Sequence, residues 1–138
     1  MANIYMLDTN ICSFIIRNQD APVLEKLQEC VLDNNRIVIS SMTYAELMFG
    51  SVGNKASPKI AGIVEEFVSR LNAILALDKK AVEASALIKK SLTVKGMNIG
   101  YNDTLIAGHA ISEGCVLVTN NTRAFIRVDG LKIEDWVN

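Results

Sequence analysis

Three acidic residues, Asp8, Glu46 and Asp103, are the side chains of this sequence best suited to shared chemistry. Asp8 directly follows a short apolar run of the type that forms a buried strand, Glu46 comes shortly after a second such run, and Asp103 lies one helix before a later run. Carboxylates that converge on one place repel one another and raise each other's pKa. A divalent cation relieves this conflict, and oxygen-only ligands select Mg²⁺ or Mn²⁺. Such a site can turn water into a nucleophile and stabilise an in-line displacement at phosphorus.

Each carboxylate also has a purely structural interpretation. Asp8 is a good N-cap for a helix that would follow it. Thr43 and Glu46 match the capping-box pattern S/T-x-x-E, although Glu46 stands among apolar neighbours, where a carboxylate without a partner is costly. A helix opened by Asn102 or Asp103 is expected, and an acid in its first turn complements the helix dipole. Taken singly, each acid is explained by capping, but the three together favour a common site.

Short strands that alternate with helices must position these acids. Short, mostly apolar runs predict strands at residues 4–7, 37–39, 73–77, 115–118 and 131–135. Apolar spacing and glycine stops predict helices at residues 23–32, 42–50, 60–71, 79–95 and 102–114. This alternation indicates an α/β fold with a mainly parallel sheet of about five short strands, covered on both faces. Ligands of such sheets bind beyond the carboxyl ends of the strands, and the first and fourth strands can be neighbours where the strand order reverses.

The composition limits the class of protein. The 138 residues suit one domain, predicted to span residues 1–138, and half of them are hydrophobic, as in globular proteins. The net charge of −1 excludes nucleic-acid binding by bulk positive charge, so such a contact must come from a local cluster. Three cysteines without a CxxC pair are expected to be free thiols in a reducing compartment. With no recognisable signal peptide and no apolar run of membrane-spanning length, a cytoplasmic location without membrane association is expected.

Several other chemistries are disfavoured by the residues available. His109 is the single histidine and lies six residues after Asp103, about 240° around a helix, so it is expected to be structural. With one histidine and no cysteine pair, a zinc site is not expected. The glycine-rich loops that hold nucleotides are absent. A phosphotransfer receiver domain needs paired acids after its first strand, where LDTN (7–10) has only one.

Five segments of the sequence are informative in combination: MLDTN (6–10), ISSMTYAELMFG (39–50), NDTLIAGHA (102–110), VLVTNNTRAF (116–125) and EDW (134–136). Together they resemble the PIN-domain ribonucleases, and among them the VapC toxins of bacterial toxin–antitoxin modules. The resemblance implies a three-layer α/β/α fold and endonucleolytic cleavage of RNA that depends on Mg²⁺ or Mn²⁺. The implied substrate is most often tRNA, cut in the anticodon stem–loop, so that translation is inhibited. The implied partners are a VapB antitoxin, whose C-terminal segment fills the groove near the acids, and a second copy of the chain in a homodimer.

The resemblance also assigns roles to individual residues. It implies that Asp8 and Asp103 are metal ligands. Glu46 would complete the acidic cluster, either through a water molecule on the metal or as a base. Asn10, Thr119 and Asn121 fall where the family places small polar residues that order the site, and this role is implied for each of the three.

One position departs from the family pattern. The family segment reads TNNTREF, whereas this chain reads TNNTRAF, so Ala124 stands where a glutamate is expected. A fourth carboxylate would help to hold a second cation or orient the attacking water, so we expect one well-held metal and weakened catalysis. The alternative is a catalytically impaired PIN domain that binds RNA or antitoxin without cleavage. The neighbouring Arg123 is either a solvated side chain or a contact to phosphate or to a partner's carboxylate.

Contacts to a nucleic acid beyond the acids are suggested by three further features. Residues 51–58 form a polar loop that is expected to select the RNA. Tyr101 either stacks on a base or packs at the edge of the core. Four basic residues either form a local track or are solvated: Lys89, Lys90, Lys95 and Arg127.

Overall fold

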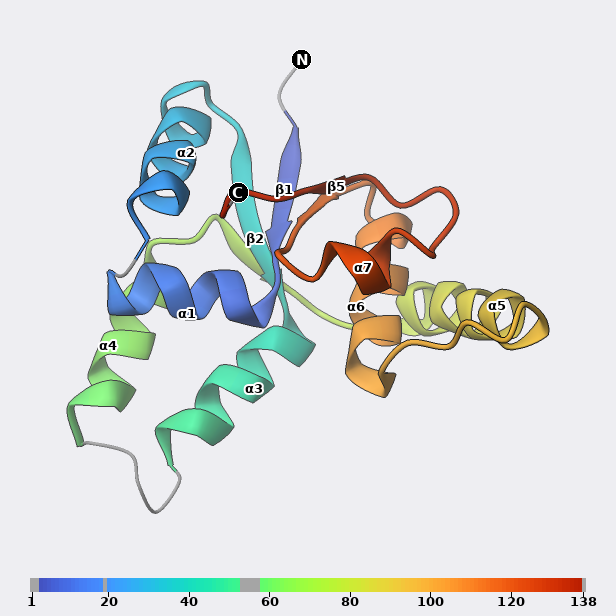
Figure 1. The fold of residues 1–138 in the computed structure, drawn as a ribbon. Helices are drawn as coiled ribbons and strands as arrows, with labels where there is room; N and C mark the ends of the chain where they lie inside the picture. The colour runs from blue at the N-terminus through green and yellow to red at the C-terminus, as the bar shows by residue number, and fades with distance from the viewer. Residues whose placement is uncertain (1–2, 19, 53–57, 138) are drawn as a thin grey trace.

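The computed structural model describes residues 3–18, 20–52 and 58–137. Helices cover both faces of a central parallel sheet (Figure 1). The strands are β1 (Ile4–Leu7), β2 (Arg36–Ser40), β3 (Ala73–Leu75), β4 (Val116–Val118) and β5 (Ile133–Glu134). The helices are α1 (Thr9–Arg17), α2 (Ala21–Leu32), α3 (Ser41–Ser51), α4 (Pro58–Ser69), α5 (Lys79–Val94), α6 (Tyr101–Ser112) and α7 (Thr122–Phe125). The predicted α/β/α fold with short parallel strands is confirmed.

The order of the strands brings the first and fourth predicted strands together. The sheet runs β3–β2–β1–β4–β5, and every neighbouring pair is parallel. The strand order therefore reverses between β1 and β4, which is where ligands gather in open α/β sheets. Leu7 of β1 is in register with Val118 of β4. The next residues, Asp8 and Thr119, consequently lie side by side beyond the carboxyl ends of the two strands.

The central strands are apolar on both faces because each face has its own core. Side chains of a strand point alternately to opposite faces of the sheet. In β1, Tyr5 and Leu7 pack with buried residues of α1, α2, α3 and α4, whereas Met6 packs with buried residues of α5, α6 and α7. In β2, Ile37 and Ile39 join the first core and Val38 joins the second. This double burial explains the continuous apolar runs in the sequence.

The predicted ends of the elements are shifted by a few residues, and two predicted caps are wrong. The capping box of Thr43 and Glu46 does not form, because α3 begins earlier and the Ser40 hydroxyl accepts the hydrogen bond from Met42 N at 3.1 Å. Helix α6 begins at Tyr101 with Gly100 at the N-cap and no side-chain cap, so neither Asn102 nor Asp103 opens it. The segment after β4, for which no helix was predicted, contains the short helix α7.

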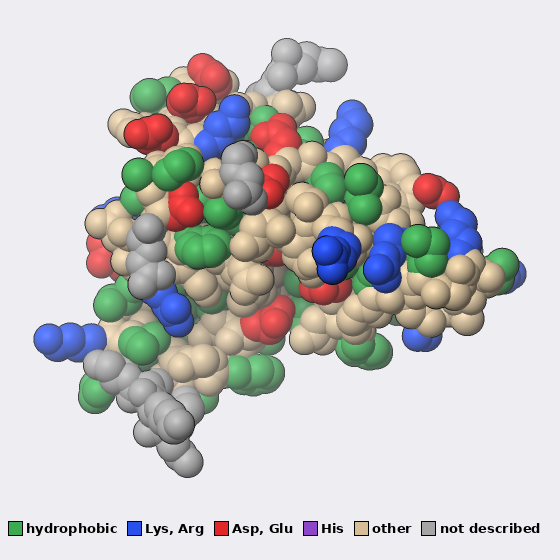
Figure 2. Space-filling model, in the orientation of Figure 1, with side chains coloured by type: hydrophobic (Ala, Val, Ile, Leu, Met, Phe, Trp, Pro, Cys, Tyr) green, Lys and Arg blue, Asp and Glu red, His purple; other side chains and the backbone are tan. Residues whose placement is uncertain are grey.

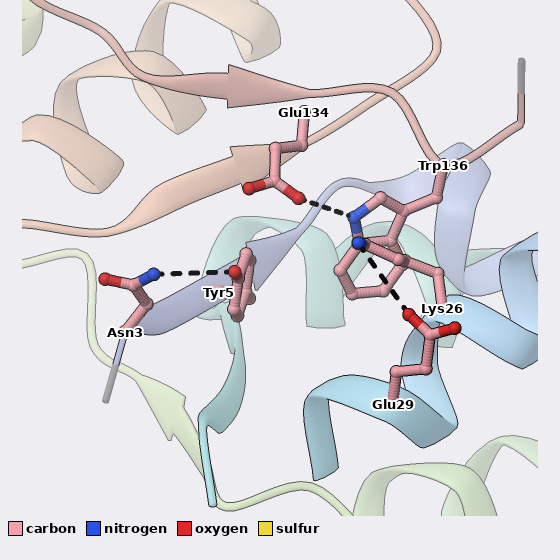
Figure 3. A network of polar contacts seen from close by, with 6 residues as sticks. All are labelled: Asn3, Tyr5, Lys26, Glu29, Glu134 and Trp136. Atoms are coloured by element: carbon pink, nitrogen blue, oxygen red, sulfur yellow. Dashed lines mark hydrogen bonds and ion pairs between the residues drawn. The ribbon is translucent and has the colours of Figure 1, made fainter. Parts of the chain in front are cut away.

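The C-terminal segment is fastened to β1 by an aromatic contact (Figure 3). Trp136 is buried, and its ring lies 5.6 Å from that of Tyr5, centroid to centroid, with the planes tilted by 55°. Its indole Nε1 donates to Glu134 Oε1 at 3.0 Å, and Asn3 Nδ2 donates to the Tyr5 hydroxyl at 3.5 Å. The exposed pair Lys26–Glu29 on α2, 3.9 Å apart, adds little to stability.

Other predictions about the chain concern its thiols, its surface and one loop. Cys12, Cys30 and Cys115 are free thiols, as predicted, and the structure shows that all three are buried. Over the described residues, no helix combines the length and the apolar character needed to cross a membrane. Residues 53–57, which form most of the predicted RNA-selecting loop, lie outside the described residues.

Candidate active site

Asp8 is both a helix cap and a site residue. It is only 6% exposed and follows β1 directly. Its Oδ1 accepts a hydrogen bond from Ile11 N at 3.0 Å and thereby caps α1. Its Oδ2 accepts from the Thr119 hydroxyl at 2.5 Å, across from the end of β4. The capping and functional interpretations of Asp8 are therefore compatible, because each uses a different oxygen.

The segment after β4 connects two of the three carboxylates. Thr119, which donates to Asp8, also accepts a hydrogen bond from Asn121 N at 3.0 Å. The side-chain amide of Asn121 in turn donates from Nδ2 to Asp103 Oδ2 at 3.4 Å. Asp103 lies in the first turn of α6. A continuous polar chain therefore runs from Asp8 through Thr119 and Asn121 to Asp103.

Glu46 on α3 is linked to the site by a hydrogen bond from Thr9, a residue that was not predicted to belong to the site. The Thr9 hydroxyl donates to Glu46 Oε1 at 2.8 Å, which joins the first residue of α1 to the middle of α3. Asn10, which was predicted to order the site, is exposed and takes no part in these hydrogen bonds. The only sequence signal for Thr9 was its position directly after Asp8.

Burial and mutual repulsion both act on the carboxylates. Burial raises the pKa of Asp8, hydrogen bonds from Thr119 and Ile11 lower it, and the negative charges of Asp103 and Glu46 raise it further. Burial also raises the pKa of Asp103, with a further increase from Glu46 and an opposing effect of the Asn121 hydrogen bond. The three acids predicted to converge therefore interact electrostatically, as the sequence analysis expected.

The chemistry of these groups suits a hard cation that keeps part of its water shell. Every acidic group here offers oxygen, which Mg²⁺ and Mn²⁺ prefer. Within the described residues, no group of three or more His, Cys, Asp and Glu side chains is placed to hold a metal ion. A closed protein cage is therefore not formed. Mg²⁺ is commonly held by one or two carboxylates together with several waters, and Asp8 and Asp103 fit that arrangement.

Comparison with known proteins identifies the family. The family model described as PIN domain matches residues 5–131. The chain belongs to the PIN-domain family. It is 42% identical over 132 residues to a Shigella flexneri protein named tRNA(fMet)-specific endonuclease VapC, which covers 96% of this chain and 97% of the relative. It is 40% identical over 133 residues to Ribonuclease VapC2 of Rickettsia felis, covering 96% and 98%.

Solved structures place this PIN domain among toxin–antitoxin proteins. The structure of VapBC2 from Rickettsia felis bound to a promoter DNA fragment contains a chain with a TM-score of 0.88 and 39% identity, over 96% of this chain and 98% of that one. A chain in the DNA-bound VapBC structure from Salmonella typhimurium gives a TM-score of 0.87 and 41% identity, over 99% of both chains. Sequence and structure therefore agree that this PIN domain is a member of the VapC ribonuclease group.

Helix α7 occupies the position of the departure from the family motif. Its Phe125 is fully buried and anchors the helix, whereas Arg123 is exposed. Ala124 lies between them, half-buried, and contributes no carboxylate to this PIN domain. Figure 2 shows several Lys and Arg side chains over the α7 and α5 side of the molecule, with acidic side chains nearer its middle. Arg123 is therefore available to a ligand, and α7 supplies a positive rather than a negative group.

Two of the basic residues proposed as a track have partners within the chain. Lys95 Nζ forms an ion pair with Asp129 Oδ2 at 2.9 Å. Arg127 Nη1 donates to the main-chain oxygens of Met97 and Asn98, at 3.5 and 3.2 Å. Both contacts fasten the segment before α6 to the segment after α7. Lys95 and Arg127 are therefore engaged within the chain rather than fully available to a nucleic acid.

The remaining predictions near α6 concern Tyr101 and His109. Tyr101 is 77% exposed, which excludes the core-edge interpretation. His109 is fully buried, and its Nδ1 lies 2.8 Å from the Ser40 hydroxyl. Burial lowers the pKa of His109. His109 is therefore a structural core residue, as predicted, and it ties α6 to the end of β2. Tyr101 faces solvent at the first residue of α6.

Proposed function

We propose that this chain is the toxin of a toxin–antitoxin pair and an endoribonuclease that depends on Mg²⁺ or Mn²⁺. Its proposed substrate is tRNA, cut in the anticodon stem–loop, so that translation in the cytoplasm is inhibited. The observation that carries the proposal is the hydrogen-bonded chain from Asp8 through Thr119 and Asn121 to Asp103, at the reversal point of the sheet. The name of one relative, tRNA(fMet)-specific endonuclease, supports tRNA as the substrate.

Each side chain of the site has a distinct proposed task. Asp8 and Asp103 would hold the cation, which supplies charge neutralisation and activation of water for attack at phosphorus. Thr119 holds the Asp8 carboxylate in place by a hydrogen bond, and Asn121 holds the Asp103 carboxylate in the same way. Glu46 orients the attacking water or takes its proton. Arg123, exposed on α7, contacts a phosphate of the RNA with its forked guanidinium.

The missing carboxylate at position 124 is expected to lower the rate rather than change the reaction. With alanine there, the acidic residues available are Asp8, Glu46 and Asp103. We therefore propose attenuated cleavage with one cation. Ala124 also motivates a second candidate function, in which the domain binds RNA or antitoxin without cutting.

An antitoxin of the VapB type is the proposed protein partner. A groove of about 940 Å³ lies between α1, α2 and α4, and its lining includes Leu7, the residue before Asp8. Most of its other large side chains are apolar, and three are charged. The apolar ones are Ile15, Ile16, Leu24, Leu27, Val31, Leu32, Ile37, Ile63, Phe67 and Leu71, and the charged ones are Arg36, Glu66 and Arg70. An amphipathic segment of an antitoxin would bury its apolar face in such a groove. The relatives of known structure are VapBC complexes, which supports this class of partner.

A homodimer is the proposed state of the chain itself. Leu87 and Val94 of α5 are 70% and 81% exposed, and Ile126 after α7 is 73% exposed. Exposed apolar side chains that gather into one patch mark association surfaces, and these three are the proposed members of such a patch. Light scattering of the purified chain, coupled to size exclusion, measures whether its mass is that of one copy or two.

A cleavage assay tests the catalytic proposal. Purified protein is incubated with total tRNA in Mg²⁺, in Mn²⁺ or in EDTA, and the new RNA ends are mapped. Cuts in the anticodon stem–loop are expected with either cation and none with EDTA. The matched control is Asp103→Asn, which keeps shape and removes charge and is expected to lose at least about a hundredfold in rate.

An Ala124→Glu variant separates the two candidate functions. Faster cleavage than in the parent chain is expected if the site is attenuated. Binding of tRNA by the parent without any cleavage, together with cleavage by Ala124→Glu, would instead favour the binding role. If Ala124→Glu binds the metal and still cuts no RNA, the endoribonuclease proposal is wrong.

A further inference from the structure

Glu46 is held differently from the other two carboxylates of the site. Asp8 and Asp103 each receive a hydrogen bond from the 119–121 segment. Glu46 lies on α3 and receives its hydrogen bond from Thr9, at 2.8 Å from Oγ1 to Oε1. The position of its carboxylate relative to Asp8 therefore depends on a contact across 37 residues of sequence.

Thr9 is well suited to fix that position. It is the residue after Asp8 and the first residue of α1. The main chain before it is held by the bond from Asp8 N to Val118 O at 3.0 Å, and the helix start by the Asp8 cap on Ile11 N. A β-branched side chain also has restricted rotation about χ1. The Thr9 hydroxyl is thus a donor on a short side chain and a well-held main chain, whereas the longer Glu46 side chain has three rotatable bonds.

We infer that Thr9 is a positioning residue of the active site, whose hydroxyl holds the Glu46 carboxylate in register with Asp8. The inference rests on the proposed function for its effect on RNA cleavage. Its importance is raised by Ala124, because without a glutamate at that position the site relies on Glu46 as its third carboxylate. If the hydrogen bond from Thr9 were lost, the Glu46 carboxylate would no longer be held toward the cation and water that Asp8 and Asp103 are proposed to bind.

Three substitutions test the hydroxyl. Thr9→Val keeps the shape and removes the donor, and Thr9→Ser keeps the donor. Thr93→Val is the matched control, because the Thr93 hydroxyl also donates to a side-chain oxygen, Asn98 Oδ1 at 3.0 Å, but does so on the exposed end of α5. All three are compared with the parent chain in kcat and KM for a tRNA anticodon stem–loop, and in melting temperature.

The expected result is a fall in kcat of about tenfold for Thr9→Val with little change in KM, because misplacing a catalytic group affects the transition state more than substrate binding. Thr9→Ser is expected to restore most of the parent kcat, and Thr93→Val to leave it unchanged. A purely structural role of Thr9 would not produce this split between kcat and KM. If Thr9→Val has the parent kcat, or if Thr9→Ser is as slow as Thr9→Val, the inference is overturned.

Crystal structures of Thr9→Val and Thr9→Ser give a readout that does not depend on cleavage. The Glu46 carboxylate is expected to move away from residue 9 in Thr9→Val, where the hydrogen bond is lost, and to keep its position in Thr9→Ser. An unmoved Glu46 in Thr9→Val overturns the inference. If the parent chain cuts no RNA, the proposed function fails, and the position of Glu46 in these structures still decides the role of Thr9.

Discussion

The two helical layers of this PIN domain differ in how closely they pack. On one face of the sheet, α6 lies so close to α5 that a Cβ added to Gly108 would lie 2.1 Å from Ser85 Oγ and 2.6 Å from Ser85 N. On the other face, which α1, α2 and α4 cover (Figure 1), these helices line a groove of about 940 Å³. The difference separates two tasks. The close layer fixes Asp103 on α6, and the open layer leaves apolar surface for a partner.

The largest expected change in stability comes from Gly108→Ala in the close layer. The new methyl group would overlap both the side chain and the main chain of Ser85, so the two helices must move apart. We expect the free energy of unfolding to fall by about 3 kcal/mol, at the upper end for overpacking. Urea denaturation measures the loss. A Gly108→Ala chain as stable as the parent would mean that the two layers do not differ.

Cation binding is expected to stabilise the edge shared by the two layers. At a concentration of Mg²⁺ or Mn²⁺ about 100 times its Kd, linkage raises the free energy of unfolding by about 2.7 kcal/mol. Asp8→Asn/Asp103→Asn should abolish this response and should be more stable than the parent without metal, because burial and repulsion no longer penalise charges there. Thermal melting with and without cation checks both. A parent melting temperature that is indifferent to both cations contradicts a shared site.

A positive charge introduced into the groove of the open layer is expected to weaken binding of the proposed antitoxin. Leu27 of α2 lines the groove, so Leu27→Arg would place an unpaired cation against the apolar face of the antitoxin segment. We expect its affinity to fall by about 10- to 100-fold, as for a residue near the centre of an interface. The matched control is Val52→Arg, an exposed position beyond the groove. Calorimetric titration with antitoxin measures both, and equal effects would place the partner elsewhere.

Acidification is expected to act in opposite directions on His109 and on the two aspartates of the site. Burial lowers the pKa of His109 below its value in the unfolded chain, so its contribution to stability is complete above about pH 6.5 and is lost as the pH falls through that region. The pKa of Asp8 and of Asp103 is raised above the unfolded value, so protonating them as the pH falls through their folded pKa stabilises the fold. Once these carboxylates begin to protonate, the melting temperature should fall more steeply with decreasing pH in Asp8→Asn/Asp103→Asn than in the parent. His109→Gln should flatten the fall, and a parallel descent in all three chains refutes the assignment.

The smallest expected effect repeats the glycine substitution in the open layer. Gly62 is exposed within α4, and a Cβ there would meet nothing within 4 Å. Alanine favours helix, so Gly62→Ala should raise the free energy of unfolding by about 0.5–1 kcal/mol. The same urea experiment measures it. A loss of stability at Gly62 would show that α4 is packed as closely as α6.

The helices and strands were predictable from the sequence because the residues that they bury are apolar and recur at a characteristic spacing. The continuous run IYML (4–7) reflects a strand buried on both faces, and the spacing of Ile60, Val64 and Phe67 reflects one apolar stripe on α4. The ends were less predictable, since local rules allow several caps. Ser40 rather than Thr43 caps the N-terminus of α3, because α3 follows β2 directly.

The site was predictable where its residues follow strands and not where a helix decides orientation. Asp8 and Thr119 follow paired strands, so their contact follows from strand order. Choosing between Thr9 and Asn10 depends on how α1 is rotated relative to α3, and that rotation is set by tertiary packing. Adjacent helical residues point about 100° apart, so only one of the two can meet Glu46.

Trp136 gives this molecule a built-in optical reporter. It is the single tryptophan of the chain, is buried, and packs on Tyr5 in β1, the strand directly before Asp8. Its emission is therefore expected to be shifted to short wavelength while the last segment is docked, and to move to long wavelength when that segment detaches. Detachment of the C-terminal segment could thus be followed separately from global melting, without a label and in the presence of RNA or antitoxin.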